Sequence, residues 1–452
     1  MIAVRALAPW LRRAGGRDQR LTTALAVTAF AVSTALTLSV IGGLLGFLCR
    51  AEHPTTAYLR TMGPDYVIFA WAALILLVVP LVTLGGGAAR LGVARRDARL
   101  ATLRLLGVTP REVVVLTVLE TSWQGLLGAV AGALGYVALL PVWTRITFQA
   151  DPFTVGELWV GWPILLASLV AVPLLAAVSG AVSLRRVVVS PLGVANRATP
   201  GRLKAVRLVV ALVALGVFMV VSTFLSAFGP AAIAFFLGCF AVAFAAMNVV
   251  GPWVLGLLGR LALRGASTPA RMLAARRLID DPRAAWRVVG GLGLAGFVAG
   301  SLSIIPTFAA SDPQGDPDIV LLVADLSRGA VLTLVITFVV AAASAGIAQA
   351  ASVLDRRREY ALAHLAGVPV ELFDAVRRRE VIGPMLVVSV GSAVAAVLMF
   401  FPLLGAAVLQ SPGGLLLLVG CLVGGAALVF AATETSRPLL REVLAETVVR
   451  AG

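Results

Sequence analysis

Long runs of apolar residues recur along the chain, with short polar stretches between them. Each run has about 20 residues or more, enough for an α-helix to cross a hydrocarbon core of about 30 Å. The pattern therefore predicts ten transmembrane helices, which we number as spans in chain order. Their expected bounds are 21–48, 67–93, 112–140, 158–184, 205–228, 231–258, 286–310, 328–353, 381–402 and 413–433.

The composition agrees with a chain that lies mostly in lipid. Of its 452 residues, 60% are hydrophobic and 13% are charged, whereas soluble domains carry about 25% charged residues. This balance excludes a soluble protein. The fold class that follows is an all-α polytopic membrane protein.

The positive charge is concentrated on one side of the predicted membrane. With the N-terminus in the cytoplasm, 33 of the 37 Lys and Arg residues fall in cytoplasmic segments. This bias is typical of membrane topology and, with an even number of spans, predicts that both termini are cytoplasmic. The net charge of +15 is thus explained by contact with anionic lipid headgroups, and no nucleic-acid partner is expected.

The chain contains an internal repeat at an offset of 260 residues. The segment "RRDARLATLRLLGVTPREVVVLTVLE" begins at Arg95, and "DRRREYALAHLAGVPVELFDAVRRRE" begins at Asp355. The copies lie between spans 2 and 3 and between spans 8 and 9, so both face the same side and the repeat is parallel. The shared positions are Arg96/Arg356, Ala101/Ala361, Leu105/Leu365, Gly107/Gly367, Val108/Val368 and Glu120/Glu380.

Residue patterns for catalysis or metal binding are missing from the sequence. A Walker A loop needs Gly-Lys-Ser/Thr, but the single lysine, Lys204, follows Leu203. His53 and His364 are predicted on opposite sides of the membrane, which argues against a shared metal or nucleophile site. No catalytic residue and no metal site is therefore expected. The cysteines are isolated in or beside spans and fit no metal site or disulfide framework: Cys49, Cys239 and Cys421.

Two acidic residues lie inside predicted spans and are equivalent in the repeat. Glu120 and Glu380 are each about ten residues into their helix, or about 15 Å along it. Acids at that depth are candidates for a function in the membrane. The alternative is that both lie near the cytoplasmic headgroups and pair with neighbouring arginines, and the sequence leaves both readings open.

Small residues four apart permit close contact between helices in two spans. The pairs are Gly128 with Gly132 and Gly420 with Gly424. In a bundle of ten helices, packing inside the chain is expected before a subunit interface.

Each copy of the repeat predicts a short cytoplasmic helix that turns back into the membrane. Gly107 and Gly367 suit a helix C-terminus with positive φ, and Pro110 and Pro369 discourage continuation of the helix. The expected helices are 94–108 and 354–368. An ordinary connector with positive-inside charge is the alternative, but the glycine is retained at a fixed offset. Two such helices would suit a twofold partner.

The second copy resembles a family signature. "RRREYALAHLAGV" at 356–368 resembles the segment that follows a span in FtsX-like permeases of ABC transporters, and the first copy departs from it with Arg99 where the second has Glu359. "LRRVVVSPLGVANRA" at 184–198 resembles the segment that closes the four-span unit of this family, and "LAARRLIDDPRAAW" at 273–286 resembles the segment that precedes such a unit.

This resemblance implies a mechanotransmission (type VII) ABC system in the bacterial plasma membrane. The chain itself would bind no cofactor and would not be an enzyme, because ATP and Mg²⁺ would sit on separate cytoplasmic ATPases, one homodimer for each permease chain. The short helices would rest on that dimer and couple to it. The coupling residues implied are Arg96, Arg99, Leu103, Arg104, Leu106, Gly107, Arg356, Arg357, Glu359, Leu362, Leu365 and Gly367.

The resemblance also implies a domain organisation. A first four-span unit would occupy 1–200, a two-span linker 201–265, and a second four-span unit 266–452. The arrangement is similar to that of ten-span permeases of the bacitracin-resistance type. Those carry a large external domain between spans 7 and 8, where this chain has only 311–327.

Three functions are open at this stage. The first is ATP-driven export or extraction of an amphiphilic substrate, a peptide antibiotic or a lipid. The second is a regulatory permease that passes the state of the ATPase to a membrane sensor kinase or an external partner. An ion-coupled transporter is disfavoured, because the repeat is parallel and carboxylates near the midplane are scarce.

Overall fold

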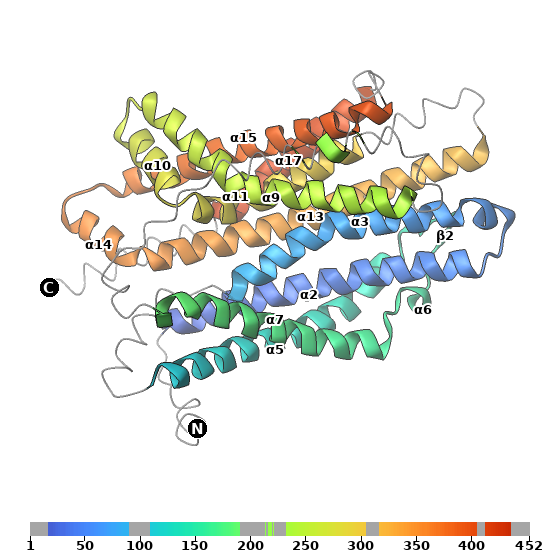
Figure 1. Ribbon diagram of the computed structural model, residues 1–452, viewed down its shortest axis with the longest axis horizontal. Coiled ribbons are helices and arrows are strands. Elements are labelled where there is room, and N and C mark those ends of the chain that lie inside the picture. Colours follow the sequence, from blue (N-terminus) through green and yellow to red (C-terminus); the bar gives the residue numbers. More distant parts are fainter. Residues whose placement is uncertain are drawn as a thin grey trace.

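The computed structural model describes residues 17–89, 109–189, 213, 216–218, 220, 232–303, 316–404 and 412–434. Long helices run side by side along the longest axis of the molecule (Figure 1). Their bounds are α2 Arg17–Glu52, α3 Ala57–Ala89, α5 Pro110–Trp143, α7 Gly161–Val189, α9 Ala232–Arg264, α11 Pro282–Leu302, α13 Pro317–Asp355, α15 Val370–Leu404 and α17 Pro412–Glu434.

Among the described residues, eight helices are long and apolar enough to cross a membrane, which confirms an all-α polytopic membrane protein. They correspond to eight of the ten predicted spans. The apolar part of α17, Leu418–Ala432, is shorter. Most of the span predicted at 205–228 falls outside the described residues.

Several helices begin where a capping residue precedes proline. The cap side chain accepts a hydrogen bond from a backbone N–H of the first turn. Proline fits the first helical position because it lacks an N–H, and an N–H at that position would have no partner within the helix. At α5 the cap is a full capping box, with Thr109 and Glu112 bonding each other's backbone N–H. The cap–proline pairs are Thr109–Pro110, Thr268–Pro269, Asp281–Pro282 and Asp316–Pro317.

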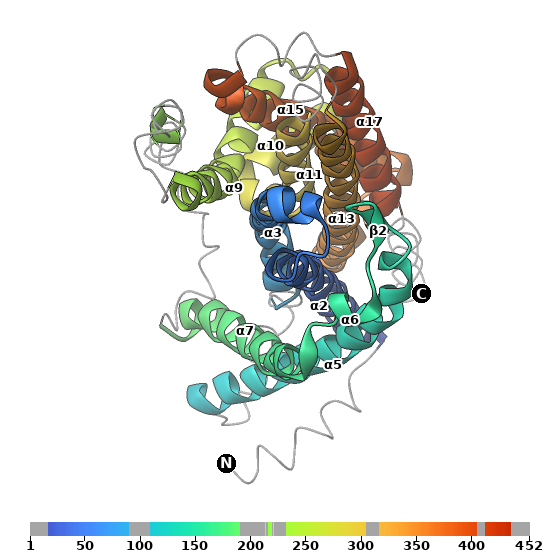
Figure 2. The ribbon, with the colours of Figure 1, turned by 90° about the vertical axis from the view of Figure 1, so that its right-hand side faces the viewer.

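The packing of the helices follows the 260-residue offset over much of the bundle. The helices α3 and α13 begin at equivalent positions, as do α5 and α15. The pairs α2–α5 and α11–α15 pack most extensively, α2–α3 and α11–α13 pack alike, and α3 lies against α13 in the middle (Figure 2). The last helices differ, because α7 packs chiefly on α5 whereas α17 packs on α13 and α11.

Both extensive pairs depend on glycines spaced four residues apart. A Cβ at Gly132 of α5 would lie 2.6 Å from Ala31 O of α2. A Cβ at Gly296 of α11 would lie 2.5 Å from Ser389 O of α15, and Gly300 is equally close to α15. The prediction of internal packing is confirmed for Gly128 and Gly132 and is wrong for the second pair, since Gly420 and Gly424 are exposed on α17.

The two ends of the bundle carry different short elements. We call one the basic end because its short helices contain Arg271, Arg276, Arg277, Arg357 and Arg358. The basic end carries the short helices α10 Pro269–Asp280 and α14 Arg357–Leu365, at the left of Figure 1. The opposite, hairpin end carries β1 Thr147–Phe148, β2 Asp151–Pro152 and α6 Val155–Leu158. The two strands pair antiparallel, with Thr147 opposite Pro152 and Phe148 opposite Asp151.

Candidate functional site

The short helix α14 at the basic end is the second of the two helices expected from the repeat. After α13 ends at Asp355, Arg356 forms a turn and α14 runs from Arg357 to Leu365. Gly367 has φ +85°. Its N–H donates to His364 O at 2.9 Å, and the N–H of Val368 donates to Ala363 O at 3.1 Å.

This pair of bonds is the Schellman arrangement that ends a helix at a left-handed residue. The second copy thus has a short helix followed by a glycine with positive φ, and this helix, Arg357–Leu365, is shorter than the expected 354–368 because α13 extends to Asp355. The first copy, 94–108, lies outside the described residues.

One side chain holds α14 against the bundle. The Tyr360 side chain is 4% exposed and packs among Val353 and Phe373. Its ring meets that of Phe373 edge to face, with the centroids 5.4 Å apart. Such pairs contribute about 0.5–1.5 kcal/mol beyond the area they bury. Tyr360 thus anchors α14 to the first turn of α15.

The other side of α14 is open and partly apolar. Leu362 and Leu365 are 58% and 60% exposed, and Glu359 and Gly367 are also exposed. Leucines that project from the basic end, beside charged groups, are available to a partner that covers them.

A polar junction joins α14 to two other helices through Arg277 of α10. The Arg277 Nη1 donates to Tyr360 Oη at 3.4 Å and to Glu380 Oε2 of α15 at 3.3 Å. The guanidinium carbon also lies 5.5 Å from the centroid of the Tyr360 ring. Burial disfavours the charged form of Arg277, but Tyr360 and Glu380 outweigh it, so the pKa of Arg277 lies above its usual value. Arg277 therefore stays positively charged in the junction.

The helix α10 is fixed to α15 along its length. Arg379 Nη1 donates to Thr268 Oγ1, the cap of α10, at 2.8 Å. Farther along, Ala270 and Ala274 pack on Val376. Asp281 alone separates α10 from α11, which is the most buried of the apolar helices. The helix α10 therefore lies between α14, which it contacts through Arg277, and α11, which follows it in the chain.

A second set of ion pairs ties α15 to α17 at the same end. Glu434 lies 3.5 Å from Arg377 Nη2 and 3.3 Å from Arg378 Nε. Arginines that the sequence analysis interprets as topology signals thus also bind a neighbouring helix here.

The positions of the predicted site residues are as follows. Glu380 pairs with Arg277, as in the alternative in which the repeated acids pair with nearby arginines, and Glu120 is half-buried on α5. Arg356 is half-buried at the turn before α14, and Arg357 is the first residue of α14. Outside the described residues lie Arg96, Arg99, Leu103, Arg104, Leu106 and Gly107.

Arg277 and Tyr360 were not among the residues expected from the sequence. A signal for Arg277 exists, because Arg17 precedes it by the same 260 residues that relate Glu120 to Glu380. Tyr360 has Leu100 as its equivalent. The hydroxyl in the junction is therefore specific to the second copy.

No metal site emerges from the part of the chain that the structure describes. Within it, no three or more His, Cys, Asp or Glu side chains come together as metal ligands would. Cys49 and Cys421 are free thiols.

Residues 87–191 match the model of the FtsX-like permease C-terminal family. The matched region runs from the end of α3 through α5 and the hairpin to the end of α7. No match to this chain was found among curated proteins. With the eight apolar helices, the family match supports a multi-pass membrane protein with the role of an ABC transporter permease.

Proposed function

We propose that this chain is the membrane subunit of an FtsX-like ABC transporter, driven by separate cytoplasmic ATPase subunits that bind ATP and Mg²⁺. The observation that carries the proposal is α14, which presents two exposed leucines at the basic end and is joined through Tyr360 to Arg277 and Glu380. The basic end is then the cytoplasmic end, in keeping with the positive-inside rule.

The ATPase is proposed to act on the bundle by moving α14. Leu362 and Leu365 are the apolar contacts for its surface, and Glu359 and Arg356 flank them with charge. A homodimeric ATPase would offer two equivalent surfaces, one for α14 and one for 94–108. Movement of α14 would pull the Tyr360 side chain. Because that side chain contacts Arg277 of α10 and Phe373 of α15, both helices would be displaced with it.

The proposed cargo is amphiphilic, a peptide antibiotic or a lipid that is exported or extracted from the bilayer. The surfaces of α5 and α7 that are exposed along the bundle carry large apolar side chains, among them Leu134, Val137, Leu166 and Val170. Such surfaces suit a molecule that travels along the protein within lipid more than one that needs an aqueous path.

The proposal predicts that acidic residues on the open side of α14 abolish ATPase binding. The chain carrying Leu362→Asp and Leu365→Asp is purified from its own cells, and the copurifying ATP-binding subunit is quantified. We expect at least a tenfold loss, since two buried leucines contribute about 1.5–3 kcal/mol each and a buried charge adds a further cost.

The matched control is Leu273→Asp, which makes the same change at an exposed leucine of α10 at the same end. This variant should retain the ATPase. Full retention of the ATPase by the α14 variant would contradict the proposal. Movement of labelled lipid or peptide in proteoliposomes containing the purified complex then separates transport from the regulatory alternative, in which the ATPase binds and no cargo moves.

A further inference from the structure

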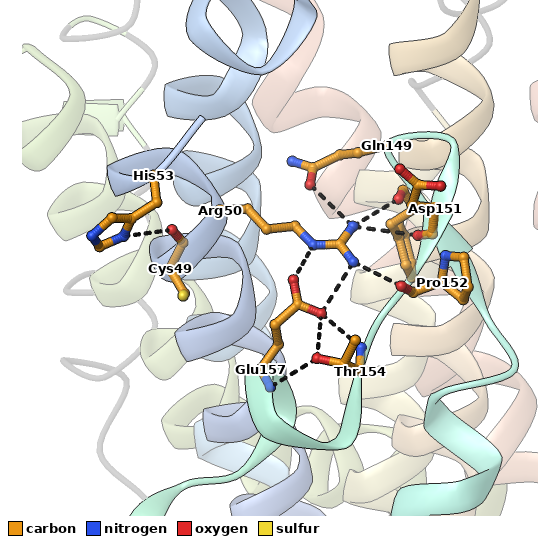
Figure 3. Close-up of polar contacts among 9 residues, drawn as sticks. Cys49, Arg50, His53, Gln149, Asp151, Pro152, Thr154 and Glu157 are labelled. Carbon is orange, nitrogen blue, oxygen red and sulfur yellow. Dashed lines mark hydrogen bonds and ion pairs between the residues drawn. The ribbon is translucent and has the colours of Figure 1, made fainter. Parts of the chain in front are cut away.

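The connection between α5 and α7, residues 144–160, forms a compact cap segment at the hairpin end. It is held on two sides by different halves of the molecule (Figure 3 shows the first side). On one side it binds Arg50 at the end of α2, in its own half. On the other side it binds Asp325 of α13, which belongs to the half that contains the second copy of the repeat.

Arg50 anchors the cap segment to its own half through many bonds. Its guanidinium binds both carboxylate oxygens of Glu157, at 2.6 and 3.3 Å. It also donates to the carbonyl of Phe148, and to those of Asp151 and Pro152 (Figure 3). A guanidinium that is bidentate to a carboxylate and surrounded by carbonyls is geometrically well defined. This side of the cap segment is a fixed attachment.

Among the described residues, the polar attachment of the cap segment to the other half is made at one carboxylate, that of Asp325. Asp325 is 1% exposed. Its Oδ2 accepts from Tyr66 Oη of α3 at 2.6 Å and from the backbone N–H of Gln149 at 2.6 Å. Its Oδ1 accepts from Arg328, one turn farther along α13. A buried carboxylate is stable only with such donors, so separating the halves here would leave it poorly satisfied.

The hairpin adopts a costly backbone conformation that supplies one of these donors. Gln149 and Ala150 have φ of +58° and +69° at the turn between β1 and β2. A two-residue turn with positive φ at both positions normally uses Asn or Gly. In addition, Gln149 Nε2 is buried and finds no acceptor among the described residues. The surrounding contacts, with Asp325 foremost, hold the turn in place.

Away from this point the halves meet through apolar side chains. Leu77, Leu81 and Leu84 of α3 cluster with Ile336, Val340 and Ile347 of α13. Apolar contact is non-directional and tolerates small sliding movements, whereas hydrogen bonds to a buried carboxylate are either made or broken. Among the described contacts between the halves, the hydrogen bonds of Asp325 therefore constrain their relative position more sharply than the apolar cluster does.

The helix α13 connects this point to the basic end. It is one helix of 39 residues that ends at Asp355, one residue before the turn into α14. Asp325 and Asp355 are separated by roughly 45 Å along it. A rigid displacement of α13 that starts at α14 would thus act directly on the bonds of Asp325.

We propose that Asp325, Tyr66 and the Gln149 backbone form a releasable interlock between the two halves at the hairpin end. When the interlock is made, α13 is held under the cap segment. When it is released, the cap segment stays on its own half through Arg50 and α13 separates from it. The interlock goes beyond the proposed permease function and does not depend on the identity of ATPase or cargo.

The test measures how fast a thiol beside the hairpin reacts. A Cβ at half-buried Gly329 of α13 would lie 3.8 Å from Phe148 Cε1, so in a Gly329→Cys chain the thiol would lie beside the hairpin. The exposed native Cys49 is removed as Cys49→Ser. The full chain in lipid nanodiscs is treated with a membrane-impermeant maleimide, and labelling at position 329 is followed by mass spectrometry.

In this background Asp325→Asn is expected to raise the labelling rate about tenfold, since Tyr66, the Gln149 N–H and Arg328 all lose their charged acceptor. Tyr66→Phe removes one donor and keeps the carboxylate, and it is expected to raise the labelling rate about threefold. The matched control is Asp318→Asn, which makes the same change at an exposed residue of the same helix and should leave the rate unchanged.

Equal rates in Asp325→Asn, Tyr66→Phe and the parent would overturn the interlock. So would an equal rise in Asp318→Asn, which would mean general loosening of the helix end. Because the assay contains neither ATP nor cargo, its failure leaves the permease function standing. Loss of ATPase binding in the α14 variant likewise leaves the interlock standing.

Discussion

Replacing Gly132 by alanine is expected to destabilise the protein by about 1–3 kcal/mol, the usual cost of forcing an extra carbon into a packed interior. The added Cβ would lie 2.6 Å from Ala31 O and 2.6 Å from Thr34 Cβ. Both are atoms on or next to the backbone of α2, so no flexible side chain can move aside. The helices α2 and α5 must separate instead. The measurement is thermal unfolding of the purified protein in detergent, followed by circular dichroism.

The same change at a second helix glycine, Gly391, is expected to affect stability in the opposite direction. No described atom lies within 4 Å of a Cβ at Gly391 of α15, and alanine favours a helix over glycine by about 0.5–1 kcal/mol. Gly391→Ala should therefore be neutral or slightly stabilising. The double change Gly128→Ala with Gly132→Ala should destabilise more than either alone, because both glycines face α2. If Gly132→Ala unfolds at the temperature of Gly391→Ala, the close approach of α2 and α5 is not needed for stability.

Reversing the charge of Arg277 or of Glu380 is expected to uncouple ATP hydrolysis from movement of the bundle. Both side chains are mostly buried, with 22% and 18% of their surface exposed. Either single reversal places two like charges in contact. Reversal of Arg277 also removes the donor to the Tyr360 hydroxyl, and reversal of Glu380 removes the acceptor that Arg277 binds. We expect each to cost roughly 2 kcal/mol of stability, and to remove the effect of the chain on the hydrolysis rate of the copurified ATPase.

The combined reversal, Arg277→Glu with Glu380→Arg, should recover a large part of both losses because the ion pair forms again. It should not recover everything, since the contact of Arg277 with Tyr360 is not rebuilt. Arg276→Glu is the matched control, because Arg276 is the exposed neighbour on the same helix. A double variant as impaired as the sum of the two singles would show that the pair does not act as a unit.

Features whose determinants lie within a few residues of one another could be predicted from the sequence. The apolar runs gave the spans because a membrane helix needs only about 20 apolar residues in a row. The end of α14 was predictable because Gly367 tolerates positive φ. The cap before Pro110 follows in the same way from Thr109 and Glu112. Hydrogen bonds from the backbone and side chain of Thr109 lower the pKa of Glu112.

The contacts that define the candidate site could not be predicted, because their members are far apart in the chain. Arg277 is 83 residues from Tyr360 and 103 from Glu380. Pairing of Glu380 with a nearby arginine was one of two readings that the sequence left open, and several arginines lie near it in the chain. Which of them it pairs with depends on how α10 lies across α15, and that is set by Ala270, Ala274 and Val376.

Asp325 shows the division between sequence and structure most clearly. Hydropathy predicts span 8 from residue 328 onward and leaves Asp325 in a loop, since an unpaired carboxylate in lipid is costly. In the structure α13 begins at Pro317 and Asp325 is buried, because Tyr66, 259 residues away, and Gln149, 176 residues away, supply donors. The sequence by itself determined which segments are apolar enough to form long helices and which glycine ends α14. Only the tertiary structure decided which polar groups can be buried, because the cost of a buried charge depends on partners that packing alone brings to it.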